Sequence, residues 1–350
     1  MRQAWNSSLS EVQTKAALTL FGNTRVQEAA FARMRKLILL SKSPGTLNIY
    51  ISSIRRWNTY ATRLNVQVFP PKVKDFSLYI SSLVDEGASI TVFKTMKSSF
   101  PFYYGARNEK SLCIIKEPFV KLLVEGALRD AAKRKGPTKK AATLTEDETK
   151  QMLESTFWPN GEENQPNSSL KEWRTAVKLF TFYNTVCRWD CYMKLTPSSF
   201  TFYEDHLVLV FDSSKNDSYY SGSTSVIAYK PGSLLCPYLI YKTYFQLMEF
   251  EGTFKEKLNC RLKPNGKPNP QRALSYGSSL TDTKELLARH GHVSGFSEKS
   301  LKSTGVTILL DKGTSLSDVQ IFGRWKSEQT PLFYHNSSIQ RRLNVSRKLI

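Results

Sequence analysis

The chain carries basic residues and one tyrosine whose types suit cleavage of a phosphodiester bond. Near its end, the run Gly323-Arg324-Trp325-Lys326-Ser327 precedes Tyr334, nine residues after the tryptophan. Four basic residues lie upstream: Arg188, Lys215, Lys299 and Lys302. Guanidinium and ammonium groups stabilise negative charge that develops on a phosphate, and a tyrosine hydroxyl can attack its phosphorus. These residue types predict a metal-free phosphoryl-transfer site.

Each of these residues has a simpler explanation when it is taken alone. An arginine near a helix end, such as Arg188, commonly lies on the surface or interacts with the helix dipole. Lys215 has serine and asparagine neighbours, which is typical of a solvated turn. Lys299 and Lys302 also fit one exposed helix face, and the tryptophan and tyrosine also fit a hydrophobic core. Only the combined order and spacing favour a shared site.

The composition favours a polyanionic partner. The 350 residues include 50 lysines and arginines against 30 aspartates and glutamates, a formal net charge of +20. Such a charge attracts nucleic acid, and a membrane surface is the alternative. No apolar run reaches about 18 residues, and the N-terminal residues lack a secretory apolar core. We therefore expect a soluble, intracellular protein that binds nucleic acid and does not span a membrane.

The cysteines and histidines do not predict a metal site. Five cysteines, an odd number in a long chain, indicate reduced thiols rather than a disulfide framework. Cys187 and Cys191 are spaced C-x3-C, but no second pair with zinc-like spacing follows. His290 and His292 have no carboxylate or cysteine at a useful offset. The cysteines are expected to be packing residues.

Residues 43–132 are predicted to form a small helical domain. Apolar residues recur at helical spacing from Leu47 to Trp57 and again from Val73 to Leu83. A third helix is expected after Ser89, and a fourth after Pro118, which suits a first turn. Residues 1–42 add one or two helices as an N-terminal extension. The apolar residues of that extension indicate a sticky face without an identified partner: Ala29, Ala30, Met34 and Leu37.

A basic linker is predicted over residues 133–142. It contains five of the basic residues that are candidates for DNA contact: Lys133, Arg134, Lys135, Lys139 and Lys140. A charge run of this kind is often a solvated linker, and the net charge of the chain adds weight to phosphate contact. Arg55 and Arg56 in the helical domain are further candidates.

Residues 143–350 are predicted to be mostly helical with a small antiparallel β-sheet. Thr145 to Glu148 matches a capping box and marks the start of this domain. A helix is expected over 172–184, followed by strands over 206–211 and 225–229. Lys215 would occupy the turn between these strands. From residue 297 the pattern is helical again, and Tyr334 falls on the helix after a break at Ser327.

Five elements in this order resemble the tyrosine recombinase (phage integrase-like) family. The spacings are 27 residues from Arg188 to Lys215 and 23 residues from Lys302 to Trp325. The resemblance covers residues 43–340 and is strongest for the Crypton and DIRS-type recombinases of eukaryotic mobile elements. The elements are Thr185-Val186-Cys187-Arg188-Trp189-Asp190-Cys191, Lys215, Lys299-Ser300-Leu301-Lys302, Gly323-Arg324-Trp325-Lys326-Ser327 and Tyr334.

The resemblance implies a core-binding (SAM-like) domain over 43–132 and a catalytic domain over 143–350, together forming a C-shaped clamp on double-stranded DNA. Tyr334 would attack a scissile phosphodiester and form a 3′-phosphotyrosyl intermediate without any cofactor. Arg188 would bind the nonbridging oxygens, and Lys215 would protonate the departing 5′-oxygen. Trp325 would donate its indole N–H to the phosphate. A homo-oligomer on DNA, dimer or tetramer, and a nuclear location are also implied.

The chain departs from the family pattern at two places. The family's His-x-x-Arg is Lys299-Ser300-Leu301-Lys302 here, so a lysine replaces the second arginine of the clamp. Lysine keeps the charge but lacks the planar fork of donors. The acidic residue usually found three positions after the first arginine is Cys191, with Asp190 one place away.

Three interpretations remain open at the level of sequence. The first is an active DNA recombinase or integrase. The second is a domesticated, catalytically silent DNA-binding protein that keeps the clamp, which the lysine pair favours. The third is a type IB topoisomerase, which shares the chemistry, although the helical block before Lys140 argues for a recombinase.

Overall fold

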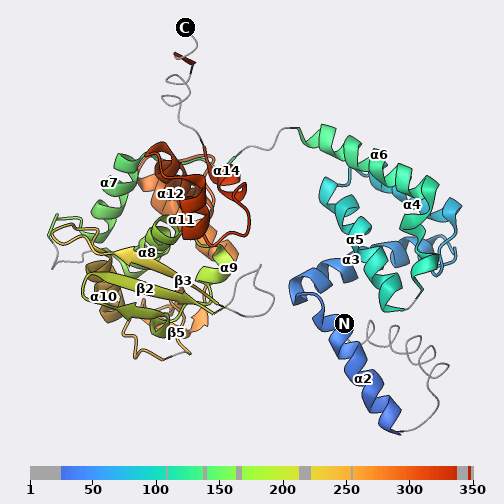
Figure 1. Cartoon of the computed structure of the whole chain (residues 1–350), viewed down its shortest axis with the longest axis horizontal. Helices are drawn as coiled ribbons and strands as arrows, with labels where there is room; N and C mark the ends of the chain where they lie inside the picture. The colour runs from blue at the N-terminus through green and yellow to red at the C-terminus, as the bar shows by residue number, and fades with distance from the viewer. Residues whose placement is uncertain are drawn as a thin grey trace. The chain divides into compact units, whose positions relative to one another are not determined.

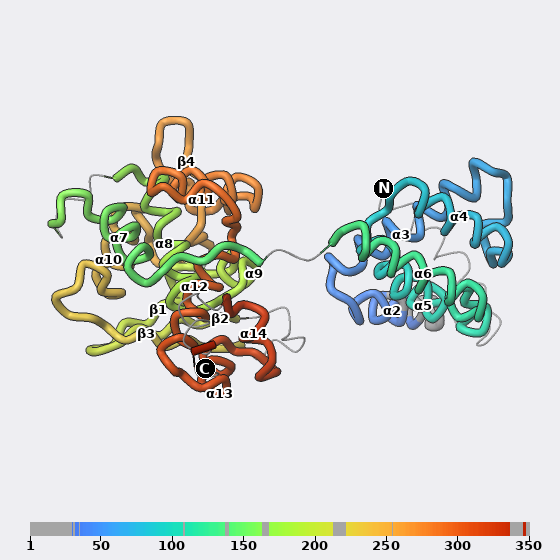
Figure 2. The backbone as a smooth tube through the Cα atoms, turned by 90° about the horizontal axis from the view of Figure 1, so that it is seen from above, coloured from blue at the N-terminus to red at the C-terminus, as the bar shows by residue number. Residues whose placement is uncertain are grey.

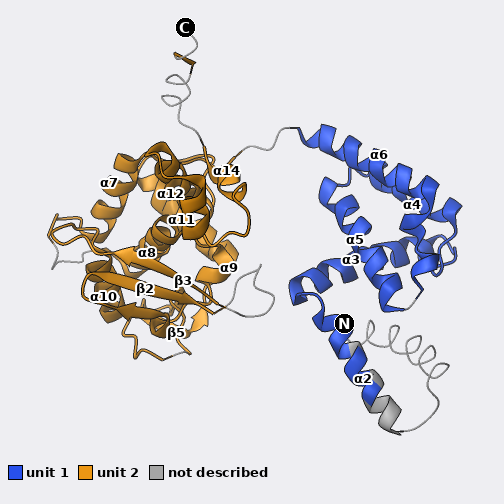
Figure 3. Ribbon diagram, viewed as in Figure 1, with its two compact units in different colours: residues 1–138 blue, residues 139–350 orange. Residues whose placement is uncertain are grey.

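The computed structural model describes residues 25–107, 109–136, 140–162, 168–212, 222–253, 255–336 and 346–347, and for 25–29, 31 and 35 the backbone only. The chain divides into two compact units, residues 1–138 and 139–350 (Figure 3). None of the described helices is long and apolar enough to cross a membrane. The structure is mostly helical with small antiparallel sheets, which confirms the predicted fold class.

The first unit is built from helices only. Its elements are α2 (Arg25–Leu40), α3 (Pro44–Arg63), α4 (Val73–Asp85), α5 (Ile90–Ala106) and α6 (Pro118–Lys135), with 3₁₀ turns at Lys110–Leu112 and Ile114–Lys116. The four helices predicted between residues 43 and 132 are all present. Met34 and Leu37 on α2 are exposed.

Aromatic side chains fill the core of this unit. Trp57 on α3 packs edge-on against Phe76 and Tyr79 of α4, with ring centroids 5.0 and 5.4 Å apart. Phe76 in turn packs against Phe100 of α5 at 5.0 Å. Ser43 begins α3 because its side chain accepts a hydrogen bond from the Thr46 backbone N–H. The spacing of these rings explains the apolar periodicity of the segment.

The basic run begins inside a helix rather than in a linker. Lys133, Arg134 and Lys135 form the last turn of α6, which ends at Gly136 with φ 65°. Basic side chains are good helix formers and stabilise the negative end of the helix dipole, so the helix continues to Lys135. Lys139 lies outside the described residues. Lys140 belongs to the second unit, where its ammonium donates to the His335 carbonyl oxygen at 2.7 Å.

The second unit surrounds one central helix with helices and two small sheets (Figures 1 and 2). The central helix is α8 (Leu170–Thr185), which α7, α10, α11 and α12 contact. The remaining elements are α7 (Glu146–Phe157), α9 (Trp189–Tyr192), β1 (Phe200–Phe202), β2 (His206–Phe211), β3 (Ser223–Ala228), α10 (Pro237–Leu247), β4 (Cys260–Leu262), β5 (Pro268–Ala273), α11 (Tyr276–Arg289), α12 (Ser300–Asp311), α13 (Leu316–Phe322) and α14 (Thr330–Tyr334).

The three-stranded sheet has the order β1-β2-β3 and is antiparallel throughout. Strand β2 occupies the predicted residues, whereas β3 begins two residues earlier than predicted and ends at Ala228. A separate antiparallel pair, β4 and β5, was absent from the sequence prediction. The capping box at Thr145 is present, with both of its hydrogen bonds. All five cysteines are free, and every one except Cys236 is buried.

A buried ion pair ties α8 to the start of α12. The Lys178 ammonium, only 1% exposed, donates to Glu298 Oε1 at 2.9 Å. It also donates to the Ser279 hydroxyl at 2.6 Å and to the Thr283 hydroxyl, both on α11. Burial lowers the pKa of Lys178 to about 8, against the opposing effect of Glu298. This one side chain therefore holds three elements together.

Helix α12 also makes a close approach to the end of α8. A Cβ added at Gly305 would lie 2.6 Å from the Tyr183 carbonyl oxygen, so only glycine fits at this point. The same added atom would meet Val186 at 3.3 Å. The contact brings the residues that follow α8 close to the first turns of α12.

We expect Gly305→Ala to reduce the free energy of unfolding by about 1–3 kcal/mol, because the new methyl group overlaps backbone that cannot move away. Urea denaturation of the two proteins measures this difference. Gly277→Ala, on α11, is the matched control because an added Cβ there meets nothing within 4 Å. That change should raise stability by about 0.5–1 kcal/mol. Equal effects of the two substitutions would contradict the close approach.

Candidate active site

Arg188 lies at a sharp turn between α8 and α9. The turn passes through Val186, a β-branched residue in the left-handed region with φ 43°. The Cys187 backbone N–H donates to the Thr185 hydroxyl at 3.3 Å, which helps to fix the turn. Arg188 then becomes the N-cap of α9, with a half-buried side chain. Strained backbone of this kind persists only where the surrounding packing holds it.

Lys302 lies on α12 and is almost completely buried, with 2% of its surface exposed. Its ammonium lies 4.9 Å from the centre of the Trp325 ring and 4.4 Å from that of the Tyr334 ring. Within the described part of the chain, no hydrogen-bond acceptor contacts this ammonium. A buried cation without an acceptor is costly, and contact with two aromatic faces offsets only part of that cost. The position is therefore suited to an incoming anion.

The electrostatics of Lys302 show which other charges lie near it. Burial lowers the pKa of Lys302 to about 7, and the positive charges of Arg188 and Arg324 lower it further, while Cys187 has the opposite effect. Burial also lowers the pKa of Arg324, with a smaller effect of the same sign from Arg188. The three cations therefore influence one another, and we call Arg188, Lys302 and Arg324 the cation cluster.

The nearby Cys187 does not neutralise the cation cluster. Burial raises the pKa of Cys187 to about 11, so its thiol is uncharged at neutral pH. Cys191 is also buried, at the position where the family resemblance expects an acid, and the adjacent Asp190 is exposed. The cluster thus keeps its positive character toward a bound anion.

Trp325 and Tyr334 stack on one another at the edge of this cluster. Their ring centroids are 5.5 Å apart and the planes differ by 13°. Trp325 is 5% exposed and belongs to a small core with Val186 and Val319. Gly323 permits this packing because a Cβ there would overlap the indole ring. Tyr334, the last residue of α14, is half-buried and remains accessible from solvent.

Arg324 is a site residue that the sequence analysis did not assign. Its backbone is left-handed, with φ 54°. One guanidinium nitrogen donates to the Ser225 hydroxyl on β3, and another donates to the Thr185 carbonyl oxygen at 3.0 Å. The only sequence signal is its place inside the run that ends in Trp325, because its partners are far away along the chain.

The structure brings some of the predicted site residues together and leaves others apart. Lys302, Trp325 and Tyr334 are in contact, and Arg188 acts on Lys302. Lys299 is the N-cap of α12 and is exposed. Lys215 lies outside the described residues, in the segment that joins β2 to β3. The remaining predicted DNA contacts that are described are exposed: Arg55, Arg56, Lys133, Arg134, Lys135 and Lys140.

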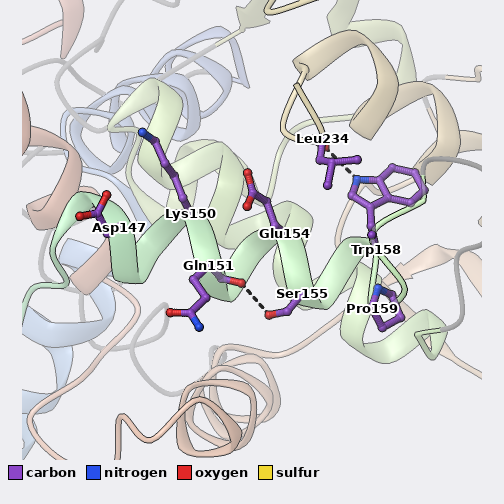
Figure 4. Close-up of a pocket in the computed structure, with 9 residues that line it drawn as sticks. Asp147, Lys150, Gln151, Glu154, Ser155, Trp158, Pro159 and Leu234 are labelled. Carbon is purple, nitrogen blue, oxygen red and sulfur yellow. Dashed lines mark hydrogen bonds between the residues drawn. The ribbon is translucent and has the colours of Figure 1, made fainter. Parts of the chain in front are cut away.

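A separate open pocket of about 460 Å³ lies along α7 and contains none of these residues (Figure 4). Asp147, Lys150 and Glu154 border it, and the Trp158 indole N–H donates to the Leu234 carbonyl oxygen at 2.8 Å beside it. Its mixed charges and its shallow form do not suit a phosphate. The cation cluster is the better candidate on chemical grounds.

The sequence matches no protein-family model and no curated protein. Several solved structures are similar to the structure of this chain. A lambda integrase dimer bound to a core site aligns with 92% of this chain and 85% of its own, with a TM-score of 0.51 and 15% identity. A Tn1549 transposon integrase in complex with a circular intermediate DNA aligns over 98% of this chain and 99% of its own, with a TM-score of 0.50 and 13% identity.

The fold is that of the tyrosine recombinases. At this level of identity the likeness establishes the fold alone, and the activity has to be argued from the site. In this tyrosine recombinase fold, the clustered cations come from the turn after α8, from α12 and from the turn after α13. Tyr334, which stacks on Trp325, comes from α14.

We expect Lys302→Met to change how stability depends on pH. Because the pKa of Lys302 falls from its ordinary 10.5 to about 7 on folding, the unfolded chain binds more protons between these two values. The unfolding free energy of the wild-type protein should therefore rise with pH across this window relative to that of Lys302→Met. Urea denaturation at a series of pH values measures the difference.

The matched control is Lys299→Met, which removes an exposed lysine one turn earlier. Its stability difference from the wild-type protein should change much less over the same window. A difference between Lys302→Met and the wild-type protein that is constant with pH would show that the Lys302 ammonium is solvated.

Proposed function

We propose that the chain is a site-specific DNA recombinase or integrase that cuts and rejoins strands through a 3′-phosphotyrosyl intermediate at Tyr334. The observation that carries this proposal is the Lys302 ammonium, which is buried against the Tyr334 ring near two arginines and has no acceptor among the described residues. A phosphodiester placed there would supply the missing acceptor and would meet the tyrosine at the same time. The recombinase fold supports the proposal.

The proposed reaction exchanges one ester bond for another. The Tyr334 oxygen forms a bond to the scissile phosphorus as the bond from phosphorus to the 5′-oxygen breaks. The tyrosine proton passes to water, and the departing 5′-oxygen takes a proton from Lys215. The phosphotyrosyl ester retains the energy of the original bond, so a 5′-hydroxyl of another strand can reverse the step. No cofactor is required.

The cation cluster would stabilise the charge on the nonbridging oxygens in the transition state. Arg188 can donate two parallel hydrogen bonds, whereas Lys302 acts as a point charge. Phosphate binding would raise the pKa of Lys302 and restore its positive charge near neutral pH. Lys299 and Trp325 occupy the positions where the family resemblance places phosphate contacts.

The proposed partner is double-stranded DNA, held by both units through the exposed basic residues of α3 and α6 together with Lys139 and Lys140. Exchange of strands requires more than one protomer, so a dimer or tetramer on DNA is part of the proposal. The Crypton and DIRS-type recombinases, which act in the nucleus, are the relatives that the motif set favours.

One feature favours a second candidate, a silent DNA-binding protein of the same fold. The lysine at position 302 cannot reproduce the fork of an arginine, and it tends to lose its proton near pH 7. Such a chain would keep DNA affinity without strand cleavage. Relaxation of supercoiled plasmid without sequence preference would instead indicate a topoisomerase.

We expect the wild-type protein to form a covalent adduct with a pool of nicked duplexes of randomised sequence, and Tyr334→Phe to form none. The nick allows the strand downstream of the cut to diffuse away, so the adduct accumulates and can be resolved by denaturing electrophoresis. Tyr276→Phe, at an exposed tyrosine of α11, is the matched control and should retain the adduct. No adduct with the wild-type protein at equal DNA binding would support the silent binder.

DNA affinity should fall steeply with salt, because released counterions drive the binding. The slope of log K against log salt is about −0.9 per phosphate contact. The double variant Lys133→Gln with Lys135→Gln should make this slope less negative by about 2. Lys312→Gln, an exposed lysine paired with Glu146, is the control and should leave the slope unchanged. Fluorescence anisotropy with a labelled duplex measures both, and a flat dependence would argue against phosphate contact.

A further inference from the structure

Helix α14, which carries Tyr334, is too short to hold its own position. It spans only Thr330–Tyr334, and Pro331 at its second position has no backbone N–H to donate. Pro331 is buried, whereas Leu332 is 40% exposed and Phe333 is 75% exposed. A single helical turn is unstable unless other parts of the protein hold it. Tertiary contacts therefore have to fix where the tyrosine lies.

The Lys140 ammonium supplies one of these contacts. It donates to the His335 carbonyl oxygen at 2.7 Å and, more weakly, to the Leu332 carbonyl oxygen at 3.5 Å. The two acceptors lie on either side of Tyr334 in the chain. The last carbonyl groups of a helix have no partner within the helix, and a positive charge at this end also suits the helix dipole. Lys140 therefore caps the C-terminal end of α14.

The residues just after α14 are held as well. The Asn336 backbone N–H donates to the Thr307 hydroxyl of α12 at 3.0 Å. The Asn336 side-chain amide donates to the Thr143 hydroxyl at 3.3 Å, in the first described residues of the second unit, which run beside α14 (Figure 1). His335 Nε2 lies 3.2 Å from Asp311 Oδ1, also on α12. Two separate parts of the unit therefore hold the chain immediately after the tyrosine.

These contacts fix the tyrosine relative to the cation cluster, because α12 carries both Lys302 and Thr307. The Lys302 ammonium lies 4.4 Å from the centre of the Tyr334 ring, and Thr307 binds the backbone two positions after that tyrosine. A shift of α14 would change the distance from the Tyr334 hydroxyl to a phosphate bound at the cluster. A misplacement of about 1 Å can slow a reaction about 100-fold.

We propose that Lys140 is a positioning residue that caps α14 and thereby places the Tyr334 hydroxyl for attack on the scissile phosphorus. This role rests on the proposed strand-transfer function. An ammonium has three N–H donors, so a further contact with a DNA phosphate is compatible with it. The two roles differ in what they control. Phosphate contact controls DNA affinity, whereas positioning controls the rate at which bound DNA is cleaved.

The first measurement is hydrogen exchange of the free protein, followed by mass spectrometry. The backbone N–H groups of His335 and Asn336 donate to the Pro331 carbonyl oxygen and the Thr307 hydroxyl, so they should exchange slowly. We expect Lys140→Met to speed exchange in peptides that cover α14 and the two residues after it by about 3- to 10-fold, because a capping hydrogen bond is lost. Exchange in peptides of α8 should stay unchanged.

The second measurement is the rate of adduct formation on the nicked duplex recovered from the pool, at saturating protein, where differences in affinity no longer matter. Lys140→Met should be slower than the wild-type protein by about 10- to 100-fold. Lys140→Arg keeps N–H donors for the same carbonyl oxygens and should stay within a few-fold of the wild-type rate. Thr143→Val removes a neutral hydroxyl that holds Asn336, and it should give a smaller defect of the same kind.

Lys312→Met is the matched control, because this exposed lysine pairs with Glu146 on α7, and it should equal the wild-type protein in both measurements. Unchanged exchange at α14 in Lys140→Met would overturn the inference, and so would an unchanged rate at saturation. A loss of affinity alone would make Lys140 a phosphate contact only. No adduct of the wild-type protein would instead refute the strand-transfer function, while hydrogen exchange would still report whether Lys140 holds α14.

Discussion

The close packing of α12 against the end of α8 determines where the cations of the site can lie. Glycine at position 305 allows the two backbones to approach, and the Lys178–Glu298 pair holds the start of α12 against α8 and α11. Arg188 follows one of these helices directly, and Lys302 lies one turn before the glycine on the other. A bulkier residue at the contact would separate the two cations, because protein interiors have little free volume to absorb the change.

The packing also explains how like charges can share a small volume. Each cation is held by a different element, so the unfavourable interaction among them is balanced by folding energy gained elsewhere in the unit. Burial raises the pKa of the neighbouring Cys187 to about 11, so its thiol adds no negative charge near neutral pH. An anion that binds at the cluster relieves the repulsion among the cations. Charges fixed in place before the reaction stabilise the negative charge of a transition state in the same way.

Sequence patterns predicted the features that depend on neighbouring residues. Strand β2, the capping box at Thr145 and the helices of the first unit follow from alternation, capping chemistry and apolar spacing. The hairpin β4–β5 escaped prediction because Pro268 and Pro270 interrupt any strand pattern. Helix α6 ends later than the basic run predicts, because lysine and arginine are good helix formers and continue the helix to Lys135.

The site itself was predictable only in part, because sequence patterns report interactions between neighbouring residues and several contacts of the site join distant ones. The nine-residue spacing of Trp325 and Tyr334 is local, and the two rings do stack. The Lys302 ammonium lies against the rings of Trp325 and Tyr334, on later elements of the chain, and Arg324 contacts Ser225, 99 positions earlier. Lys299 and Lys302 look alike in sequence, yet one is exposed and the other is enclosed by aromatic rings.

The Lys178–Glu298 ion pair is buried, so the packing that it stabilises around the site should depend little on ionic strength. The Debye length is about 8 Å at physiological salt, but screening of this kind acts on charges that solvent can reach. Salt that dissociates a polyanion from the exposed lysines and arginines would leave the buried pair intact. A polyanion bound at those exposed residues, as proposed above, could therefore leave and be replaced while the arrangement of the site stays unchanged.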